Sequence, residues 1–249
     1  MCYHCLMNND GHLLFTDGSS LGNPGPGGWG AILILAGGVV IEMGGHEDNT
    51  TNNRMELVGL IEGMKRLAQE SGDITVHIDS SYVLKGATEW IVGWQKRNWK
   101  TMGKTDVSNR DLWEALMPLL EERKKFGRIV WEHIPGHAGI EGNERADEIA
   151  TGYAANADVS LYQGELGDYA YDIMNIAADD EALRKKATSR THSRAKAYSY
   201  LSLVGGVAKR HLTWADCEAR VKGKSGVKYK KALSPADEAE ILRLWGASL

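Results

Sequence analysis

The sequence is poor in cysteine and proline, and it contains no long apolar run. Its three cysteines are too few for a disulfide framework, which favours a reducing, cytosol-like compartment. No stretch approaches the length of a membrane-spanning helix, and the N-terminus lacks the charged start and apolar stretch of a signal peptide. We therefore expect a cytoplasmic protein with no membrane partner.

Two of the cysteines are close together in sequence. Cys2 and Cys5 have C-x-x-C spacing, with His4 between them. A single pair of this kind, without a second pair, is a weak indication of zinc. Free thiols near a frayed N-terminus are the simpler alternative, and both interpretations stay open.

The apolar pattern of residues 13–155 alternates between strand-like and helix-like segments. The Gly- and Pro-rich stretch 18–28 predicts a loop, and Gly37-Gly38 predicts a hairpin turn. Three antiparallel strands followed by alternating helices and strands indicate an α/β fold, with a mixed five-stranded sheet flanked by helices. The expected strands are 13–16, 29–35, 39–43, 74–78 and 128–133, and the expected helices are 52–69, 80–96, 108–125 and 141–155.

Four acidic residues lie at strand ends or on the apolar edges of helices in this pattern: Asp17, Glu56, Asp79 and Asp147. Acidic residues rarely lie near a core unless they are paired or bind a metal. Carboxylates, together with water and phosphate oxygens, are the ligands of Mg²⁺, and two such ions can clamp both oxygens of a phosphodiester. Taken singly, each acid is better explained as a solvated strand or helix end.

Five long motifs carry a resemblance to a known family. They closely resemble type 1 ribonuclease H of the bacterial class, over about residues 13–155. The resemblance implies an endonuclease that cuts the RNA strand of RNA/DNA hybrids with two Mg²⁺ ions, Mn²⁺ being an alternative, and leaves 5′-phosphate and 3′-hydroxyl ends. The motifs are T-D-G-S-S-L-G-N-P-G-P-G-G-W-G (16–30), T-N-N-R-M-E-L (51–57), I-D-S-S-Y-V (78–83), W-I-V-G-W-Q-K-R-N-W-K-T (90–101) and G-H-A-G-I-E-G-N-E-R-A-D-E (136–148).

The same resemblance assigns roles to individual residues. Asp17, Glu56, Asp79 and Asp147 match the metal-binding carboxylates, and Glu56 would also meet the 2′-hydroxyl that distinguishes RNA from DNA. His137 matches a mobile catalytic histidine that helps proton transfer. Residues that match hybrid-binding positions are Asn23 and Asn53 near the minor groove, Thr51, Asn52 and Arg54 at a DNA phosphate, and Trp90, Trp94, Lys96, Arg97, Trp99 and Lys100 in a basic protrusion.

Some features of this surface leave alternatives open. Trp90 and Trp94 have the spacing of helical core residues as well as that of a binding surface. Ser81 stands where many family members carry Gln, and Gly93 where they often carry Asn. Both departures lie on the expected substrate face and leave the catalytic set intact.

The composition changes after residue 155. Residues 158–180 carry acids and no Lys or Arg, and we interpret them as a partly helical tether, followed by a basic linker. Residues 181–231 carry 14 Lys and Arg against three acids, which is typical of nucleic-acid binding, although a solvated lysine-rich face would give the same count. Short strands at 200–204 and 227–231 and helices at 213–221 and 234–245 predict a small α+β domain, with Cys217 in a helix core.

This region resembles the hybrid-binding domain of eukaryotic ribonucleases H, which is related to the viroplasmin domain. The matching pattern is Y-x-x-x-x-G, L-T-W-x-x-C-x-A-x-V, Y-K-K and P-A-D-E-A. The resemblance implies duplex contacts by Tyr200, Trp214, Tyr229, Lys230 and Lys231. The family usually places this domain first, whereas here it follows the catalytic domain.

We therefore expect four segments, an RNA/DNA hybrid as partner, and a monomer. A binding protein without turnover is disfavoured because all four carboxylates and His137 are present. A related nuclease of the integrase-like superfamily is disfavoured by R-M-E-L and G-N-E-R-A-D. The segments are an N-terminal extension (1–12), a catalytic domain (13–155), a linker (156–197) and a hybrid-binding-like domain (198–249).

Overall fold

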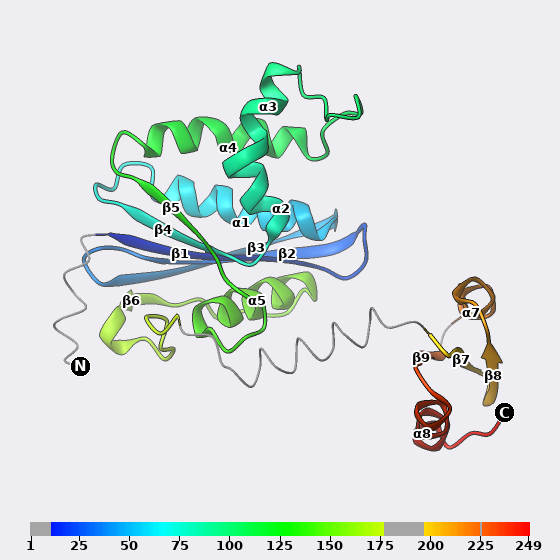
Figure 1. Cartoon of the computed structure of the whole chain (residues 1–249). Helices are drawn as coiled ribbons and strands as arrows, with labels where there is room; N and C mark the ends of the chain where they lie inside the picture. Colours follow the sequence, from blue (N-terminus) through cyan, green and yellow to red (C-terminus); the bar gives the residue numbers. More distant parts are fainter. Residues whose placement is uncertain (1–10, 177–196, 225) are drawn as a thin grey trace. The chain divides into compact units, whose positions relative to one another are not determined.

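The structure, a computed structural model, describes residues 11–176, 197–224 and 226–249. The chain divides into two compact units, with the boundary between Ala182 and Leu183 (Figure 1). Cys2, Cys5 and the predicted basic linker lie outside the described residues. Among the described residues, no helix has the length and apolar character needed to cross a membrane.

The first unit is built on one mixed sheet, whose strands follow the order β5-β4-β1-β2-β3-β6. β1 pairs in parallel with β4, and β4 with β5, whereas β2, β3 and β6 join by antiparallel pairing. The parallel half therefore places the carboxyl ends of β1 and β4 at the same edge of the sheet. The strands are β1 (His12–Ser20), β2 (Gly25–Ile34), β3 (Val39–Thr50), β4 (Ile74–Ile78), β5 (Ile129–His133) and β6 (Gln163–Glu165).

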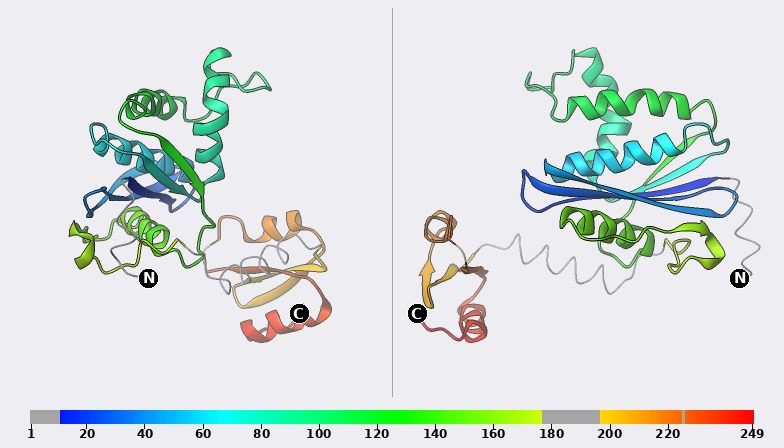
Figure 2. Two further views of the ribbon diagram at one scale, coloured as in Figure 1. Left: turned by 60° about the vertical axis from the view of Figure 1, so that its left-hand side comes forward. Right: turned by 180° about the vertical axis from the view of Figure 1, so that it is seen from behind.

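Helices cover both faces of this sheet (Figures 1 and 2). One face packs against α1 (Asn52–Arg66) and α4 (Arg110–Arg123), with an apolar core that includes Leu57 and Leu60. The other face packs against α5 (Glu141–Ala154), with Phe15 and Ile149 in its core. The predicted helices and the Gly37-Gly38 turn are confirmed.

The predicted helix at 80–96 is interrupted once. It consists of α2 (Ser81–Lys85), a π-helical turn η2 (Gly86–Trp90) and α3 (Ile91–Lys96). The break therefore begins at Gly86, where a Cβ atom would lie 2.1 Å from the Trp113 ring. Gly93 lies inside α3 and does not interrupt the helix.

The expected loop at 18–28 was wrong over much of its length, because β1 continues to Ser20 and β2 begins at Gly25. Glycine is used here for close approach of helices to strands rather than for flexibility. A Cβ on Gly18 would lie 2.2 Å from the backbone nitrogen of Glu56, and one on Gly30 would lie 2.3 Å from the carbonyl oxygen of Ala146. Gly18 therefore lets α1 approach β1, which carries Asp17, and Gly30 lets α5 approach the neighbouring strand β2.

The interpretation of residues after 155 as a tether also needs correction, as does the expectation of five strands. β6 pairs with β3 as a sixth strand, and the turn η3 (Leu166–Asp168) follows it. Ile173 is buried in the core beneath α5. The sequence does not show the alternating pattern of a strand here, because β6 has only three residues. The segment is attached instead through hydrogen bonds to the buried carboxylate of Glu42, which are described in the Discussion.

The C-terminal unit is a three-stranded antiparallel sheet with one helix on each face (Figure 1). The predicted strands appear as β7 (Ser199–Val204) and β9 (Lys228–Ala232), and β8 (Val207–His211) is a strand that the sequence reading missed. The helices are α7 (Trp214–Val221) and α8 (Pro235–Trp245), capped by the side chains of Thr213 and Ser234. Cys217 is buried in α7, as expected.

Candidate active site

Asp17 is the central carboxylate of the first unit. It lies in β1 opposite Gly30 of β2, and only 8% of its surface is exposed. Burial, together with the charges of Asp79, Asp147 and Glu56, raises its pKa to about 8, against one hydrogen bond donated by the Gly18 amide. Three further carboxylates therefore lie close enough to disfavour ionisation of the buried aspartate.

Glu56 lies in the first turns of α1 and is 9% exposed. Burial, with the charge of Asp79, raises its pKa to about 7. Two donors orient the carboxylate: the amide of Asn52 donates to Oε1 at 2.8 Å, and the hydroxyl of Ser80 donates to Oε2. These two hydrogen bonds therefore fix the orientation of the Glu56 carboxylate. Among the described residues, no cationic side chain forms an ion pair with it.

Asp147 and His137 complete the predicted set. Asp147 lies in α5, directly after the Ala146 that packs on Gly30, and accepts a hydrogen bond from the Thr151 hydroxyl at 3.3 Å. His137 Nδ1 lies 3.8 Å from Asp147 Oδ2, and the histidine side chain is 75% exposed. Its backbone has a φ of 51°, which is uncommon for a non-glycine residue. The structure thus brings His137 to the edge of the carboxylate cluster.

The chemistry of this donor set fits divalent cations. Among the residues that the structure describes, no three His, Cys, Asp or Glu side chains are already closed around one point. Mg²⁺, however, is commonly bound through one or two carboxylates plus water and phosphate oxygens. Uncompensated carboxylates with raised pKa values are the condition that a cation would relieve. The cluster therefore fits metal ions whose coordination is completed by water and substrate.

The start of α1 was expected to bind a phosphate, and its side chains are largely engaged within the protein. Asn52 donates to Glu56, so it orients a carboxylate of the candidate site. Arg54 forms a bidentate ion pair with Asp111, with nitrogen–oxygen distances of 3.0 and 2.8 Å. Thr51 is the N-cap residue without a side-chain capping bond, and Asn53 is exposed, as is Asn23.

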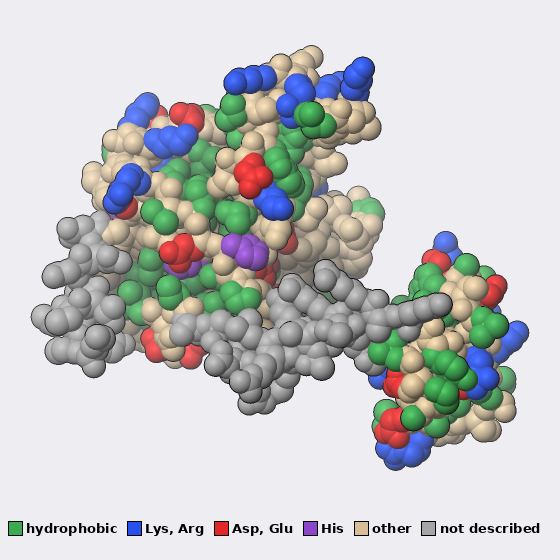
Figure 3. Space-filling model, in the orientation of Figure 1, with side chains coloured by type: hydrophobic (Ala, Val, Ile, Leu, Met, Phe, Trp, Pro, Cys, Tyr) green, Lys and Arg blue, Asp and Glu red, His purple; other side chains and the backbone are tan. Residues whose placement is uncertain are grey.

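The predicted basic protrusion divides into a core part and a surface part. Trp94 and Trp99 are each only 7% exposed, and the Trp94 ring packs 5.4 Å from the Trp113 ring. This burial places both residues in the core rather than on the expected binding surface. Figure 3 shows Lys and Arg side chains gathered over the α3 end of the unit, where Lys96 and Arg97 are exposed.

Trp90 and Lys100 have intermediate positions in the same region. Trp90 is partly buried and packs 5.6 Å from the Trp94 ring. Lys100 forms an ion pair with Asp106. The two departures from the family pattern lie nearby: Ser81 is exposed at the start of α2, and Gly93 is partly exposed in α3.

Ser80 is a site residue that the sequence analysis did not single out. Its hydroxyl donates to Glu56 and also accepts from the Val83 amide at 3.3 Å, which caps α2. One side chain therefore starts a helix and orients a carboxylate on another helix. The available signal was the Asp-Ser pair at the end of β4, where serine is a preferred helix cap.

The aromatic residues predicted in the C-terminal unit form one cluster. The Trp214 ring centroid lies 5.8 Å from that of Tyr200 and 5.5 Å from that of Tyr229. Trp214 is 42% exposed and Tyr229 is 54% exposed. Lys231 pairs with Tyr200 across the sheet, so it shares the face of the cluster. Lys230 pairs with Leu201, and its side chain therefore leaves the opposite face.

Comparisons with known proteins concern mainly the first unit. A model of the RNase H family matches residues 9–155. Ribonuclease H of Pseudomonas savastanoi pv. phaseolicola is 52% identical over 137 residues, which cover 55% of this chain and 88% of the relative. Ribonuclease HI of Pseudomonas syringae pv. tomato is also 52% identical, over 55% of this chain and 87% of its own.

A solved structure supports the same likeness. The protein titled LC9-RNase H1, a type 1 RNase H with the type 2 active-site motif, aligns with a TM-score of 0.55 and 28% identity. The alignment covers 67% of this chain and 83% of that chain. The family model ends at residue 155, so the C-terminal unit lies outside it.

Proposed function

The chain belongs to the RNase H family, whose members cleave the RNA strand of RNA/DNA hybrids, and from this premise we propose that it hydrolyses such hybrids with two divalent metal ions. The products are 5′-phosphate and 3′-hydroxyl ends. The observation that carries the proposal is the buried Asp17, whose pKa is raised to about 8 by burial and by the charges of three further carboxylates.

The four carboxylates have distinct positions in this proposal. Asp17, Glu56, Asp79 and Asp147 would hold the ions, which when bound polarise the scissile phosphate and lower the pKa of a water nucleophile. Mg²⁺ is the natural choice for an all-oxygen donor set, and Mn²⁺ accepts the same ligands. Asp17, the most buried of the four, would contact both ions.

Glu56 would also recognise the RNA strand. The donors Asn52 and Ser80 fix its carboxylate, so one oxygen is oriented to accept a hydrogen bond from the 2′-hydroxyl beside the scissile phosphate. A hybrid with a single deoxynucleotide at that position should therefore resist cutting there, while neighbouring positions are cut normally. Equal cleavage at the substituted position would remove this role from Glu56.

His137 would carry a proton between the site and solvent. Its ring is exposed and lies near Asp147, and histidine is the side chain that most often transfers protons in enzymes. His137→Ala should lower kcat while leaving the affinity for hybrid nearly unchanged.

The cleavage proposal is tested by comparing RNA/DNA, RNA/RNA and DNA/DNA duplexes with wild-type protein and Asp17→Asn. We expect cutting of the RNA strand in the hybrid alone, and its loss in Asp17→Asn with hybrid binding largely retained. Binding without cleavage by the wild-type protein in Mg²⁺ and Mn²⁺ would instead support the rival function, a hybrid-binding protein without turnover.

The C-terminal unit is proposed to bind the same duplex. The exposed cluster of Tyr200, Trp214 and Tyr229, with Lys231 on its face, suits sugar stacking and phosphate contact. A second contact joined to the first unit by a tether raises the local concentration of hybrid. Trp214→Ala should therefore raise KM on long hybrids with little change on very short ones, and equal KM values on both would refute the role.

A further inference from the structure

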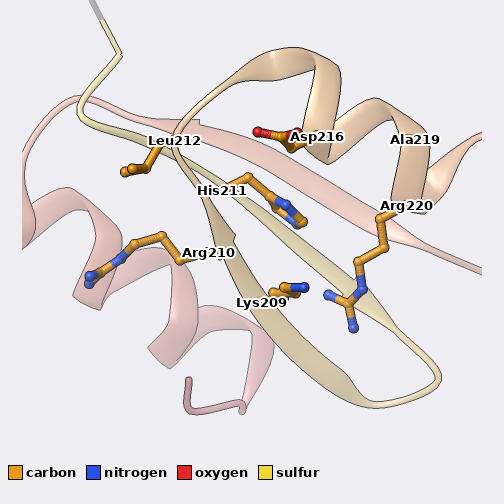
Figure 4. Close-up of a pocket in the computed structure, with 7 residues that line it drawn as sticks. All are labelled: Lys209, Arg210, His211, Leu212, Asp216, Ala219 and Arg220. Carbon is orange, nitrogen blue, oxygen red and sulfur yellow. The ribbon is translucent and has the colours of Figure 1, made fainter.

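An open pocket of about 680 Å³ lies between β8 and α7 in the C-terminal unit (Figure 4). It lies on the same sheet face as the aromatic cluster, because Lys209 of β8 and Tyr229 of β9 both pair with Ser202 of β7 and form one row across the sheet. Neighbouring strands are separated by about 4.8 Å, so Lys209 and Tyr229 start about 10 Å apart. The pocket is therefore a separate site on the face that carries the cluster.

Arg220 is held at this pocket entirely by uncharged groups. Its Nη1 donates to the Ser202 hydroxyl at 2.9 Å and to the Ser202 carbonyl at 3.2 Å, and its Nη2 donates to the Val207 carbonyl at 3.0 Å. Within the described ranges, no carboxylate lies within salt-bridge distance of Arg220 or Lys209. The guanidinium is thus fixed in position while its charge is not neutralised.

His211 adds a buried polar group between these cations. It is 7% exposed, and its Nε2 lies 2.7 Å from the fully buried Ser202 hydroxyl. Figure 4 shows the side chains of His211, Lys209 and Arg220 directed toward the same space. Burying the hydrogen-bonded network of Ser202, His211 and Arg220 has a desolvation cost. Two apolar side chains in place of Ser202 and His211 would pack the same sheet without that cost.

The remaining charged groups leave the pocket positive. Arg210 is paired with the buried Glu238 on the other side of the sheet, so its charge is compensated. Asp216, in the first turn of α7, also lines the pocket. Its Oδ2 accepts a hydrogen bond from the Thr213 hydroxyl at 2.6 Å. Two uncompensated cations, Lys209 and Arg220, therefore face one carboxylate.

We propose that Lys209, His211 and Arg220 form a phosphate-binding pocket, which takes a backbone phosphate of nucleic acid beside the segment that contacts the aromatic cluster. The fixed guanidinium gives directed donors for phosphate oxygens, and Lys209 adds a mobile positive charge. This inference rests on the proposed duplex-binding role of the unit. With this pocket, the unit would contact the nucleic-acid backbone at two sites, the aromatic cluster and the phosphate pocket.

The test uses the full chain with Asp17→Asn, which keeps the hybrid uncut. Fluorescence anisotropy would measure affinity for a long RNA/DNA hybrid over a series of salt concentrations. Lys209→Ala should reduce the slope of log affinity against log salt by about one, the loss of one phosphate contact. The matched control is Lys228→Ala, because Lys228 is exposed on the opposite face of β9.

A second measurement reports on the pocket directly. Titration with inorganic phosphate, against chloride at equal ionic strength, should shift the NMR signals of the His211 ring, and Arg220→Gln should abolish the shift. If phosphate shifts these signals but Lys209→Ala leaves the hybrid slope unchanged, the pocket takes small phosphorylated anions and the backbone assignment is overturned.

Failure of this inference can be distinguished from failure of the proposed function. If Trp214→Ala weakens hybrid binding but Lys209→Ala behaves like Lys228→Ala, the duplex-binding role stands and the second contact is refuted. If neither Trp214→Ala nor Lys209→Ala changes hybrid binding, the C-terminal unit does not bind the duplex, and both the proposed role of the unit and the phosphate pocket are refuted.

Discussion

Asp17 provides the sharpest link between stability and function in this chain. Its carboxylate is buried among three others, and its pKa is raised from 3.8 to about 8. A group whose folded-state pKa is raised stabilises the fold at low pH, and this stabilisation is lost as pH rises from the unfolded to the folded pKa. The metal-free protein should therefore lose stability between about pH 4 and pH 8.

The magnitude follows from the size of the shift. Each pKa unit corresponds to about 1.4 kcal/mol, and roughly three units separate the unfolded pKa from pH 7. At pH 7 Asp17 is ionised in the unfolded state but still mostly protonated in the folded state, and this difference lowers the free energy of unfolding by up to about 4 kcal/mol relative to low pH. Asp17→Asn removes the ionisable group but keeps an oxygen that can accept a hydrogen bond from the Gly18 amide, so we expect it to gain about 2–4 kcal/mol at pH 7.

The assay is urea unfolding followed by tryptophan fluorescence, in EDTA, at pH 4.5, 6 and 8. The difference between Asp17→Asn and the wild-type protein should grow with pH. Adding Mg²⁺ at pH 8 should stabilise the wild-type protein and have a smaller effect on the variant, because a ligand stabilises the state it binds. A constant difference at all three pH values would refute the electrostatic account of the site.

Two further predictions concern buried polar groups away from the catalytic carboxylates. Arg145 of α5 forms an ion pair at 2.7 Å with the buried Glu42 of β3, which also accepts a hydrogen bond from the Tyr169 hydroxyl at 2.5 Å. Arg145→Met should lower the free energy of unfolding by about 3–5 kcal/mol, because it leaves the buried Glu42 without its ion-pair partner. Tyr169→Phe should lower it by about 1.5–3 kcal/mol, the contribution of one hydrogen bond to a charged group, and equal losses in urea unfolding would contradict this order. Burial also lowers the pKa of His77, which stacks on Phe15 at 4.6 Å, so the contribution of His77 to stability should fall as pH drops below about 6.5, opposite in sign to that of Asp17. His77→Phe should flatten that dependence between pH 6.5 and 5, and an unchanged slope would show that His77 is not its source.

The sequence predicted the elements whose side chains follow a simple period. α1, β4 and α5 begin and end close to the expected residues because their apolar positions repeat regularly. It failed at residues 18–28, where glycine occurs in strands. A Cβ at Gly18 or Gly30 would collide with a helix backbone, and such a tertiary contact leaves no local sign that separates it from a flexible loop.

The segment after residue 155 was misread for a related reason. Its attachment depends on Glu42 of β3, which accepts hydrogen bonds from the Tyr162 amide at 2.9 Å and the Tyr169 hydroxyl at 2.5 Å. Arg145 of α5 also donates to the Ser160 carbonyl at 2.9 Å. Tyr162 and Tyr169 are 120 and 127 residues away from Glu42 in the sequence, so no periodic pattern reveals these contacts. A catalytic fragment that ended at residue 155 would lose these bonds.

The four candidate metal ligands could be identified from the sequence because their motifs are long. The direction of the pKa shifts of Asp17 and Glu56 could not, because it depends on which charged side chains lie beside each carboxylate. Glu42 and Asp17 are both buried acids in the same sheet. Glu42 is held by a bidentate arginine, and its hydrogen bonds and the Arg145 charge lower its pKa despite burial. Asp17 has acidic neighbours instead, and its pKa rises. A buried carboxylate with a cationic partner stabilises the fold, whereas one surrounded by other carboxylates destabilises it and is retained where a cation is to bind. The partner, and not the residue type or its burial, therefore separates the structural acid Glu42 from the candidate metal ligand Asp17.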